Sequence, residues 1–170
     1  MKKLLRSVAA MTVVLCMARV PQANSHKEKE TYREINSRLP PLHIVDTLGK
    51  VFTEKDFSGN GHFFLILFNP TCGHCIGMAK VMTDSSALFA QSKVAFMAGT
   101  QMAPYLRSYI QAGGLGHTPQ FAIGVDSAEA IEKLYNYTAL PQINVYDKNR
   151  KLVRIFYGEI PLDSLKTYLP

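Results

Sequence analysis

Residues 62–75 decide the fold of this chain and read His-Phe-Phe-Leu-Ile-Leu-Phe-Asn-Pro-Thr-Cys-Gly-His-Cys. The continuous apolar run over 63–68 is typical of a central β-strand that is buried on both faces of a sheet. After the cysteines, the apolar residues recur at helical spacing. The stretch therefore predicts a buried strand followed by a helix, with Cys72 and Cys75 at the N-terminus of that helix.

Working outward, the chain alternates strand-like and helical patterns. Further strands are predicted over 94–98, 120–125, 142–146 and 152–157, and further helices over 104–111, 127–135 and 162–169. Upstream, a short strand over 42–45 and its return over 51–52 predict a hairpin. Alternating strands and helices, followed by a second hairpin and a closing helix, predict one α/β sandwich around a mixed sheet.

Length and composition limit the classes of protein to consider. The 170 residues allow one domain, and 47% hydrophobic with 19% charged residues is ordinary for a globular chain. A disordered chain, a collagen, a coiled coil and a polytopic membrane protein are excluded. The net charge of +6 falls to +2 once the first 25 residues are set aside, because they hold four of the 19 basic residues and no acidic residue. This balance gives no reason to expect a nucleic-acid partner.

The N-terminal segment has the layout of a secretory signal peptide. Three basic residues precede an apolar run over 8–18, and the small residues Ala23 and Ser25 provide the −3 and −1 positions of a cleavage site. Eleven apolar residues are too few to span a bilayer. We expect a signal peptide over 1–25, which removes Cys16, a polar linker over 26–38 and the folded domain over 39–170. The expected location is periplasmic or otherwise extracytoplasmic, with an uncleaved membrane anchor as the alternative.

The Cys72–Cys75 pair has three interpretations. A structural disulfide would close only a four-residue ring, which stabilises a fold far less than the roughly 3 kcal/mol of a 15-residue loop. A zinc site needs four ligands, and the chain has no second Cys-x-x-Cys pair. A redox dithiol fits best, because the free amides and the dipole at a helix N-terminus stabilise a thiolate.

The position along the helix predicts the roles within the pair. Cys72, at the start, is the expected exposed nucleophile, and Cys75, one turn in, is the expected shielded resolving thiol. Gly73 and His74 lie between them and are expected to modulate the site. An imidazole carries partial positive charge near neutral pH, so His74 would favour the Cys72 thiolate and make the couple more oxidising. The alternative is that His74 is a solvent-facing residue without effect.

Three segments carry a longer pattern. They are Leu-Pro-Pro-Leu-His-Ile-Val-Asp-Thr-Leu-Gly-Lys at 39–50, Phe-Leu-Ile-Leu-Phe-Asn-Pro-Thr-Cys-Gly-His-Cys at 64–75, and Leu-Tyr-Asn-Tyr-Thr-Ala-Leu-Pro-Gln-Ile-Asn-Val-Tyr-Asp-Lys-Asn-Arg-Lys-Leu-Val at 134–153. This pattern resembles the thioredoxin superfamily, in particular its TlpA/ResA-type branch of extracytoplasmic thiol–disulfide oxidoreductases. The resemblance implies a thioredoxin-like sandwich over 39–170, with a central mixed sheet flanked by helices and with the first hairpin as an N-terminal extension.

The resemblance also implies site residues. In that branch the Cys-x-x-Cys pair is catalytic, and a cis-proline beside it shapes the substrate groove. Carried over, Pro141 is the cis-proline, and Leu140 before it binds substrate. A proline at the start of a strand has no backbone N–H to donate, so the neighbouring backbone stays free to pair with an extended substrate segment. Pro119 is the rival for this place. One departure is Ile66, six residues before Cys72, where thioredoxin carries a buried aspartate.

The function predicted from these features is reduction or exchange of disulfides in partner proteins, without a cofactor or a bound metal. The expected partners are protein thiols and disulfides, and a membrane or soluble redox protein that resets the dithiol. Two alternatives remain. One is net disulfide oxidation or isomerisation, which His74 favours. The other is a copper-binding module that uses Cys72, Cys75 and His117, with methionines as soft ligands. These methionines are Met78, Met82, Met97 and Met102, and their spacing also suits core packing.

Overall fold

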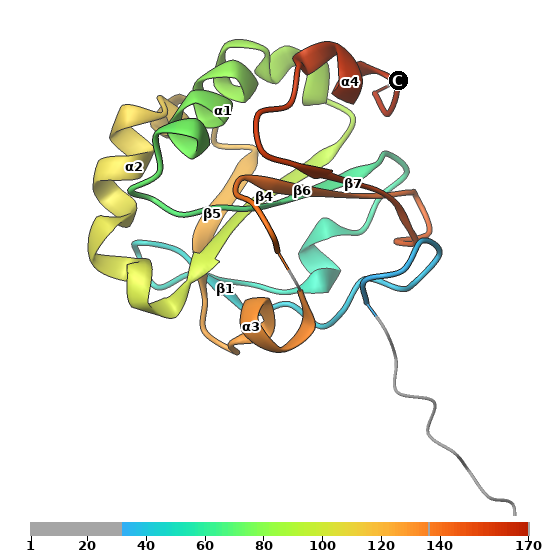
Figure 1. Cartoon of the computed structure of the whole chain (residues 1–170), viewed down its shortest axis with the longest axis horizontal. Coiled ribbons are helices and arrows are strands. Elements are labelled where there is room, and N and C mark those ends of the chain that lie inside the picture. Colours follow the sequence, from blue (N-terminus) through green and yellow to red (C-terminus); the bar gives the residue numbers. More distant parts are fainter. Residues whose placement is uncertain (1–31, 136, 170) are drawn as a thin grey trace, which may run out of the picture.

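The computed structural model describes residues 32–135 and 137–169, so the expected signal peptide lies outside the described residues. A seven-stranded mixed sheet forms the centre (Figure 1). Its strands are β1 Ile44–Val45, β2 Val51–Phe52, β3 Phe63–Leu67, β4 Lys93–Gly99, β5 Phe121–Asp126, β6 Gln142–Tyr146 and β7 Leu152–Tyr157.

The strand order is β2-β1-β5-β4-β3-β6-β7. The inner strands β5, β4 and β3 run parallel to one another. At one edge, β6 pairs antiparallel with β3, and β7 pairs antiparallel with β6. β1 pairs antiparallel with both β2 and β5, so the predicted hairpin extends the sheet at the other edge. The α/β sandwich and its hairpin extension are confirmed.

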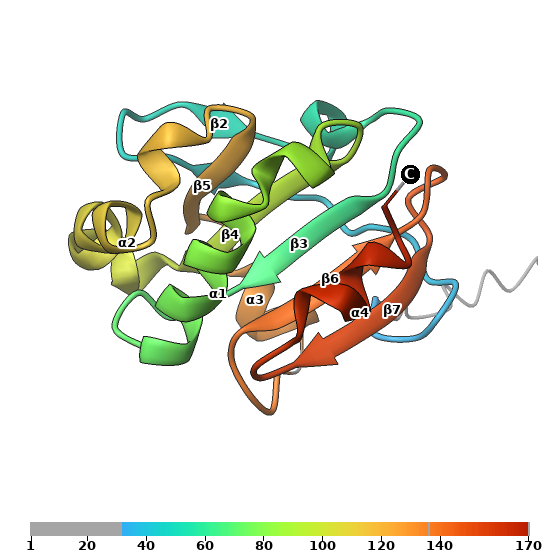
Figure 2. The same ribbon diagram turned by 90° about the horizontal axis from the view of Figure 1, so that it is seen from above.

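Helices cover both faces of the sheet. α1 Gly73–Asp84, α2 Leu106–Ala112 and α4 Leu162–Lys166 lie on one face, and α3 Ala130–Leu134 lies on the other (Figures 1 and 2). Short 3-10 helices complete the connections: Glu54–Phe57, Ser86–Phe89, Thr100–Tyr105 and Leu115–His117. Within the described residues, no helix is both long enough and apolar enough to cross a membrane.

β3 explains why the sheet is buried on both faces. Its five residues are all fully buried, and their side chains alternate between two cores. Phe64 and Ile66 join the core under α1 and α2, which also holds Cys75. Phe63, Leu65 and Leu67 join the core on the α3 side. Because β3 is buried on both faces, packing fixes its position in the sheet. The start of α1, a few residues further on, is fixed with it.

Three predicted helices differ from the structure. The helix expected over 162–169 ends at Lys166 and is followed by a turn. The helix expected over 104–111 begins as a 3-10 segment that contains Pro104, and α2 starts only at Leu106. The helix expected over 127–135 is shorter. The Asp126 carboxylate accepts hydrogen bonds from the backbone N–H groups of Ala128 and Ile131, which holds the intervening residues in a turn. Side chains of Asp compete with helical hydrogen bonds in this way.

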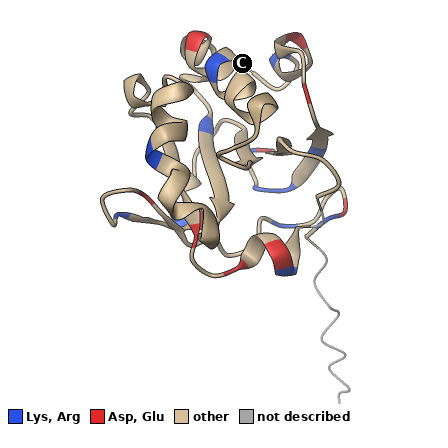
Figure 3. Ribbon diagram, turned by 60° about the vertical axis from the view of Figure 1, so that its left-hand side comes forward, with Lys and Arg blue, Asp and Glu red and all other residues tan. Residues whose placement is uncertain are grey.

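Part of the expected polar linker is held against the domain. The backbone N–H of Asn36 donates to the carbonyl oxygen of Leu152, and the N–H of Leu152 donates to the carbonyl oxygen of Ser37. The Arg33 side chain donates to the carbonyl oxygen of Leu134. Residues 33–38 therefore pack on the fold rather than extend from it. Figure 3 shows acidic and basic positions interspersed over helices and loops in that view.

Candidate active site

A tight turn after β3 places Cys72 at the N-terminus of α1. The Asn69 side-chain oxygen accepts hydrogen bonds from the backbone N–H and the hydroxyl of Thr71, each at 2.9 Å. The Cys72 N–H donates to the Asn69 carbonyl oxygen at 3.0 Å. Asn is suited to such turns because its side chain bonds the backbone two residues on. Cys72 is the N-cap of α1 and is partly exposed, as its predicted position requires.

Cys75 lies one turn further into α1 and is fully buried. The backbone N–H of Asn69 points to its sulfur, with 3.5 Å between nitrogen and sulfur. Burial raises the pKa of the Cys75 thiol to about 12; the neighbouring Cys72 adds to the rise, and the Asn69 N–H opposes it. Both cysteines are free thiols, so the pair is in its dithiol form with one accessible and one shielded sulfur.

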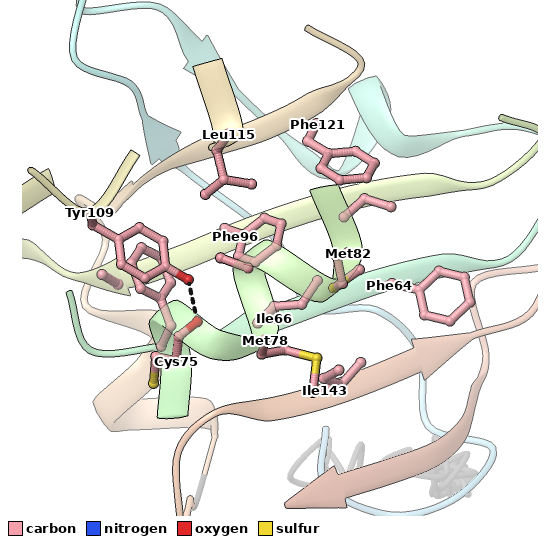
Figure 4. Packing of buried hydrophobic residues seen from close by; sticks show 14 of the residues in the cluster. Phe64, Ile66, Cys75, Met78, Met82, Phe96, Tyr109, Leu115, Phe121 and Ile143 are labelled. Atoms are coloured by element: carbon pink, nitrogen blue, oxygen red, sulfur yellow. Dashed lines mark hydrogen bonds between the residues drawn. The ribbon is translucent and has the colours of Figure 1, made fainter. Parts of the chain in front are cut away.

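Tyr109 of α2 supports the pair from behind and was missed by sequence reasoning. Its hydroxyl donates to the carbonyl oxygen of Cys75 at 3.1 Å (Figure 4). Its ring stacks on Phe68, with 4.1 Å between ring centroids. Tyr109 is almost fully buried, and burial raises the pKa of its phenol far above the ordinary value. In the sequence, it was an apolar position of a predicted helix, so no signal marked it.

His74 does not stand alone in solvent. Its Nδ1 lies 2.6 Å from the Oε1 of Glu159, which follows β7 and precedes α4. The two side chains are 67% and 76% exposed. From the sequence, His74 was expected to act as a lone cation, whereas in the structure a carboxylate lies beside it. Gly73 is exposed, and a Cβ added there would meet no atom within 4 Å.

Leu140 packs on the same core as Cys72 and Cys75, and Pro141 follows it in the chain. The Leu140–Pro141 peptide bond is cis, and no other peptide bond among the described residues is cis. Pro119 is therefore not the cis-proline. Leu140 lines a hollow together with Asn69, the residue whose N–H contacts the Cys75 sulfur. Gln101, Glu132 and Tyr137 contribute to the same hollow, and none of them was singled out from the sequence.

The metal alternative lacks a ligand cluster. In the part of the chain that the structure describes, no three His, Cys, Asp or Glu side chains gather closely enough to hold an ion. His117 lines a different hollow, with Thr47 and Arg107. Met78 and Met82 belong to the core under α1, and Met97 belongs to the core on the opposite face of the sheet. These methionines fill the two cores.

Comparisons with known proteins show which proteins the chain is similar to. No family model matches the chain. Thiol-disulfide oxidoreductase ResA from Bacillus thuringiensis subsp. konkukian is 26% identical over 145 residues, which cover 83% of this chain and 80% of the relative. ResA from Geobacillus thermodenitrificans is 24% identical over 165 residues, which cover 97% and 92%.

Solved structures show the same fold. The thioredoxin domain of a thiol-disulfide oxidoreductase from Bacteroides vulgatus superposes with a TM-score of 0.61 at 14% identity, over 79% of this chain and 94% of that domain. The fold and the relatives together define the class: the chain is a thiol–disulfide oxidoreductase with a thioredoxin-like fold. Within that class it is ResA-like, as the sequence resemblance indicated.

Proposed function

We propose that this chain is an extracytoplasmic enzyme that reduces or exchanges disulfides in partner proteins, with Cys72 as the nucleophile and Cys75 as the resolving thiol. One observation carries the proposal. Cys72 is partly exposed at the N-terminus of α1, whereas Cys75, one turn below, is fully buried. A partner disulfide therefore has access to the first sulfur and not to the second.

The chemistry proceeds in two exchanges. The Cys72 thiolate attacks one sulfur of a partner disulfide, the S–S bond breaks, and the departing sulfur takes a proton to become a thiol. A mixed disulfide now joins Cys72 to the partner. The Cys75 thiol then loses its proton and attacks the Cys72 sulfur, which releases the second partner thiol. The partner gains two electrons and two protons, and the enzyme is left with a Cys72–Cys75 disulfide.

Burial of Cys75 serves this order of events. Its raised pKa keeps the thiol protonated near neutral pH, so the buried sulfur does not compete with Cys72 for the partner. The Asn69 N–H is positioned to stabilise the sulfur when the proton leaves. Because Cys75 is buried, its attack occurs only after the mixed disulfide has formed at the Cys72 sulfur beside it.

Leu140 and Pro141 are proposed to bind the partner chain. Pro141 precedes β6 and has no N–H, and Leu140 is half-buried at the rim of the hollow beside Asn69. An extended partner segment that carries the target disulfide can pair with the Leu140 backbone by strand addition. Apolar rim residues such as Tyr137 and Met102 would contact its side chains.

The proposed setting follows from the N-terminal sequence. A signal peptide over 1–25 and a polar linker from 26 precede the thioredoxin-like domain over 39–170, which acts outside the cytosol. The disulfide formed in each cycle must be reduced again, so a membrane or soluble redox protein has to deliver two electrons to Cys72–Cys75. Net oxidation is the same sequence run backwards, and the potential of the couple decides between the directions.

Reduction of insulin disulfides by the chain, with dithiothreitol as electron source, tests the proposal. The expected result is faster reduction than with dithiothreitol alone, and loss of this acceleration in Cys72→Ser. Copper retention after dialysis is the parallel test for the metal-binding alternative. Retained copper together with no insulin reduction would reject the proposed function.

A further inference from the structure

His74, which lies between the two cysteines in the first turn of α1, is hydrogen-bonded to Glu159. His74 is two residues after Cys72 in the first turn of α1, and Glu159 lies in the connection between β7 and α4. Their 2.6 Å contact therefore joins the active-site helix to a segment 85 residues further along the chain. The other residues that line the groove between these segments are Gly77, Met78, Val81, Ile160 and Pro161, and none of them is charged.

The contact also fixes which imidazole nitrogen carries a proton. An ionised carboxylate only accepts hydrogen bonds, so Nδ1 of His74 is the donor to Glu159. The hydrogen bond at one ring nitrogen determines the role left to the other. Within the described part of the chain, Nε2 of His74 has no hydrogen-bond partner, and Glu159 makes no second ion pair.

We infer that Glu159 is a positioning residue of the active site, which orients the His74 imidazole and cancels its charge, and thereby sets the redox potential of Cys72–Cys75. The inference rests on the proposed function and deepens it. It also revises the charge argument from the sequence. A lone imidazolium would stabilise the Cys72 thiolate, whereas an imidazolium paired with a carboxylate presents no net charge.

The sign of the effect does not depend on whether the imidazole is protonated. The carboxylate carries one negative charge, so the pair carries between one negative charge and none. Replacing Glu159 by Gln leaves between no charge and one positive charge, so the potential at Cys72 becomes more positive in every protonation state. A more positive environment favours the thiolate and hence the dithiol, which makes the couple more oxidising.

The test is the equilibrium between the chain and glutathione. One disulfide form plus two molecules of glutathione gives one dithiol form plus glutathione disulfide. The fraction of the Cys72–Cys75 peptide in each form is measured by mass spectrometry after acid quenching and alkylation. We expect Glu159→Gln to shift the equilibrium constant towards the dithiol by about two- to fivefold, as befits an exposed pair. We expect His74→Gln to shift it the other way, with the double variant between Glu159→Gln and the wild type.

Two controls separate this role from a structural one. Glu129→Gln removes the same charge from an exposed ion pair with Lys133, at the start of α3 on the other face of the sheet, and should leave the constant unchanged. The shift in Glu159→Gln should shrink between about 20 mM and about 500 mM salt, because screening acts on exposed charges and not on a change of fold.

An equilibrium constant for Glu159→Gln that equals the wild-type value at low salt, or that moves towards the disulfide, would overturn the inference and leave the proposed function intact. A wild-type chain whose cysteines form no disulfide across the glutathione series would overturn both. A shift of the expected sign that is independent of salt would show that Glu159 acts through structure rather than charge, which also contradicts the inference.

Discussion

The Tyr109 hydroxyl donates a 3.1 Å hydrogen bond to the carbonyl oxygen of Cys75. This bond ties α2 to the first turn of α1 from within the core, and the Asn69 N–H reaches the Cys75 sulfur from β3's end. The resolving cysteine is thus held at its backbone and at its side chain by two separate segments. The Cys72 backbone donates to Asn69 and accepts from Ile76, while its side chain stays partly exposed.

Tyr109→Phe should lower the free energy of unfolding by about 1 kcal/mol, because it removes one buried hydrogen bond while retaining the ring packing against Phe68. Urea unfolding followed by circular dichroism measures the change. Tyr105→Phe is the matched control, since Tyr105 is half exposed and should cost almost nothing. Equal stability of the two variants would show that the hydroxyl contributes nothing to holding Cys75.

The Cys75 thiol should titrate far above an ordinary cysteine. In Cys72→Ser, the rate of Cys75 alkylation by iodoacetamide should stay low and reach half its maximum only at a pH far above that of an ordinary cysteine, since burial is the main cause of the raised pKa and remains in this variant. In 8 M urea, the midpoint should return to about 8.5. A folded-state midpoint near that of the unfolded chain would mean that Cys75 is solvated.

Arg150 should stabilise the second hairpin and the loop before β3. Its guanidinium donates to the carbonyl oxygens of Phe57, Gly61 and Asp147 at 2.7 to 2.9 Å. Arg150→Ala should lower the free energy of unfolding by about 2 kcal/mol, because several partly buried carbonyl groups lose a charged donor. Lys148→Ala, in the same turn and exposed, should change it by less than about 0.5 kcal/mol. A similar loss in both would reject this role.

The part of the site that sequence could predict is the part built from local order. The apolar run over 63–67 fixes a strand, Asn69 fixes the turn, and the helix then begins at Cys72, so the exposed and shielded sulfurs follow within a dozen residues. Side-chain contacts between segments that lie far apart in the chain cannot be predicted from such local patterns. Glu159 meets His74 across 85 residues, and its neighbours in the sequence are not periodic.

Tyr109 illustrates a second limit. The sequence predicts a helix around it, but a helical pattern does not distinguish a tyrosine that fills space from one whose hydroxyl bonds a particular carbonyl group. The shortened α3 has a comparable origin. Asp126 competes for the backbone N–H groups that the helical pattern had assigned to the first turn.

Trapping the mixed disulfide tests the roles of Cys72 and Cys75 most directly. Cys75→Ser is incubated with a peptide that contains a disulfide and is analysed by mass spectrometry under acid conditions. One peptide thiol should become joined covalently to Cys72, since the attacking sulfur remains and the resolving sulfur is gone. Cys72→Ser should form no adduct at Cys75, because that sulfur is buried. An adduct at Cys75 in Cys72→Ser, or none at Cys72 in Cys75→Ser, would contradict the assigned roles.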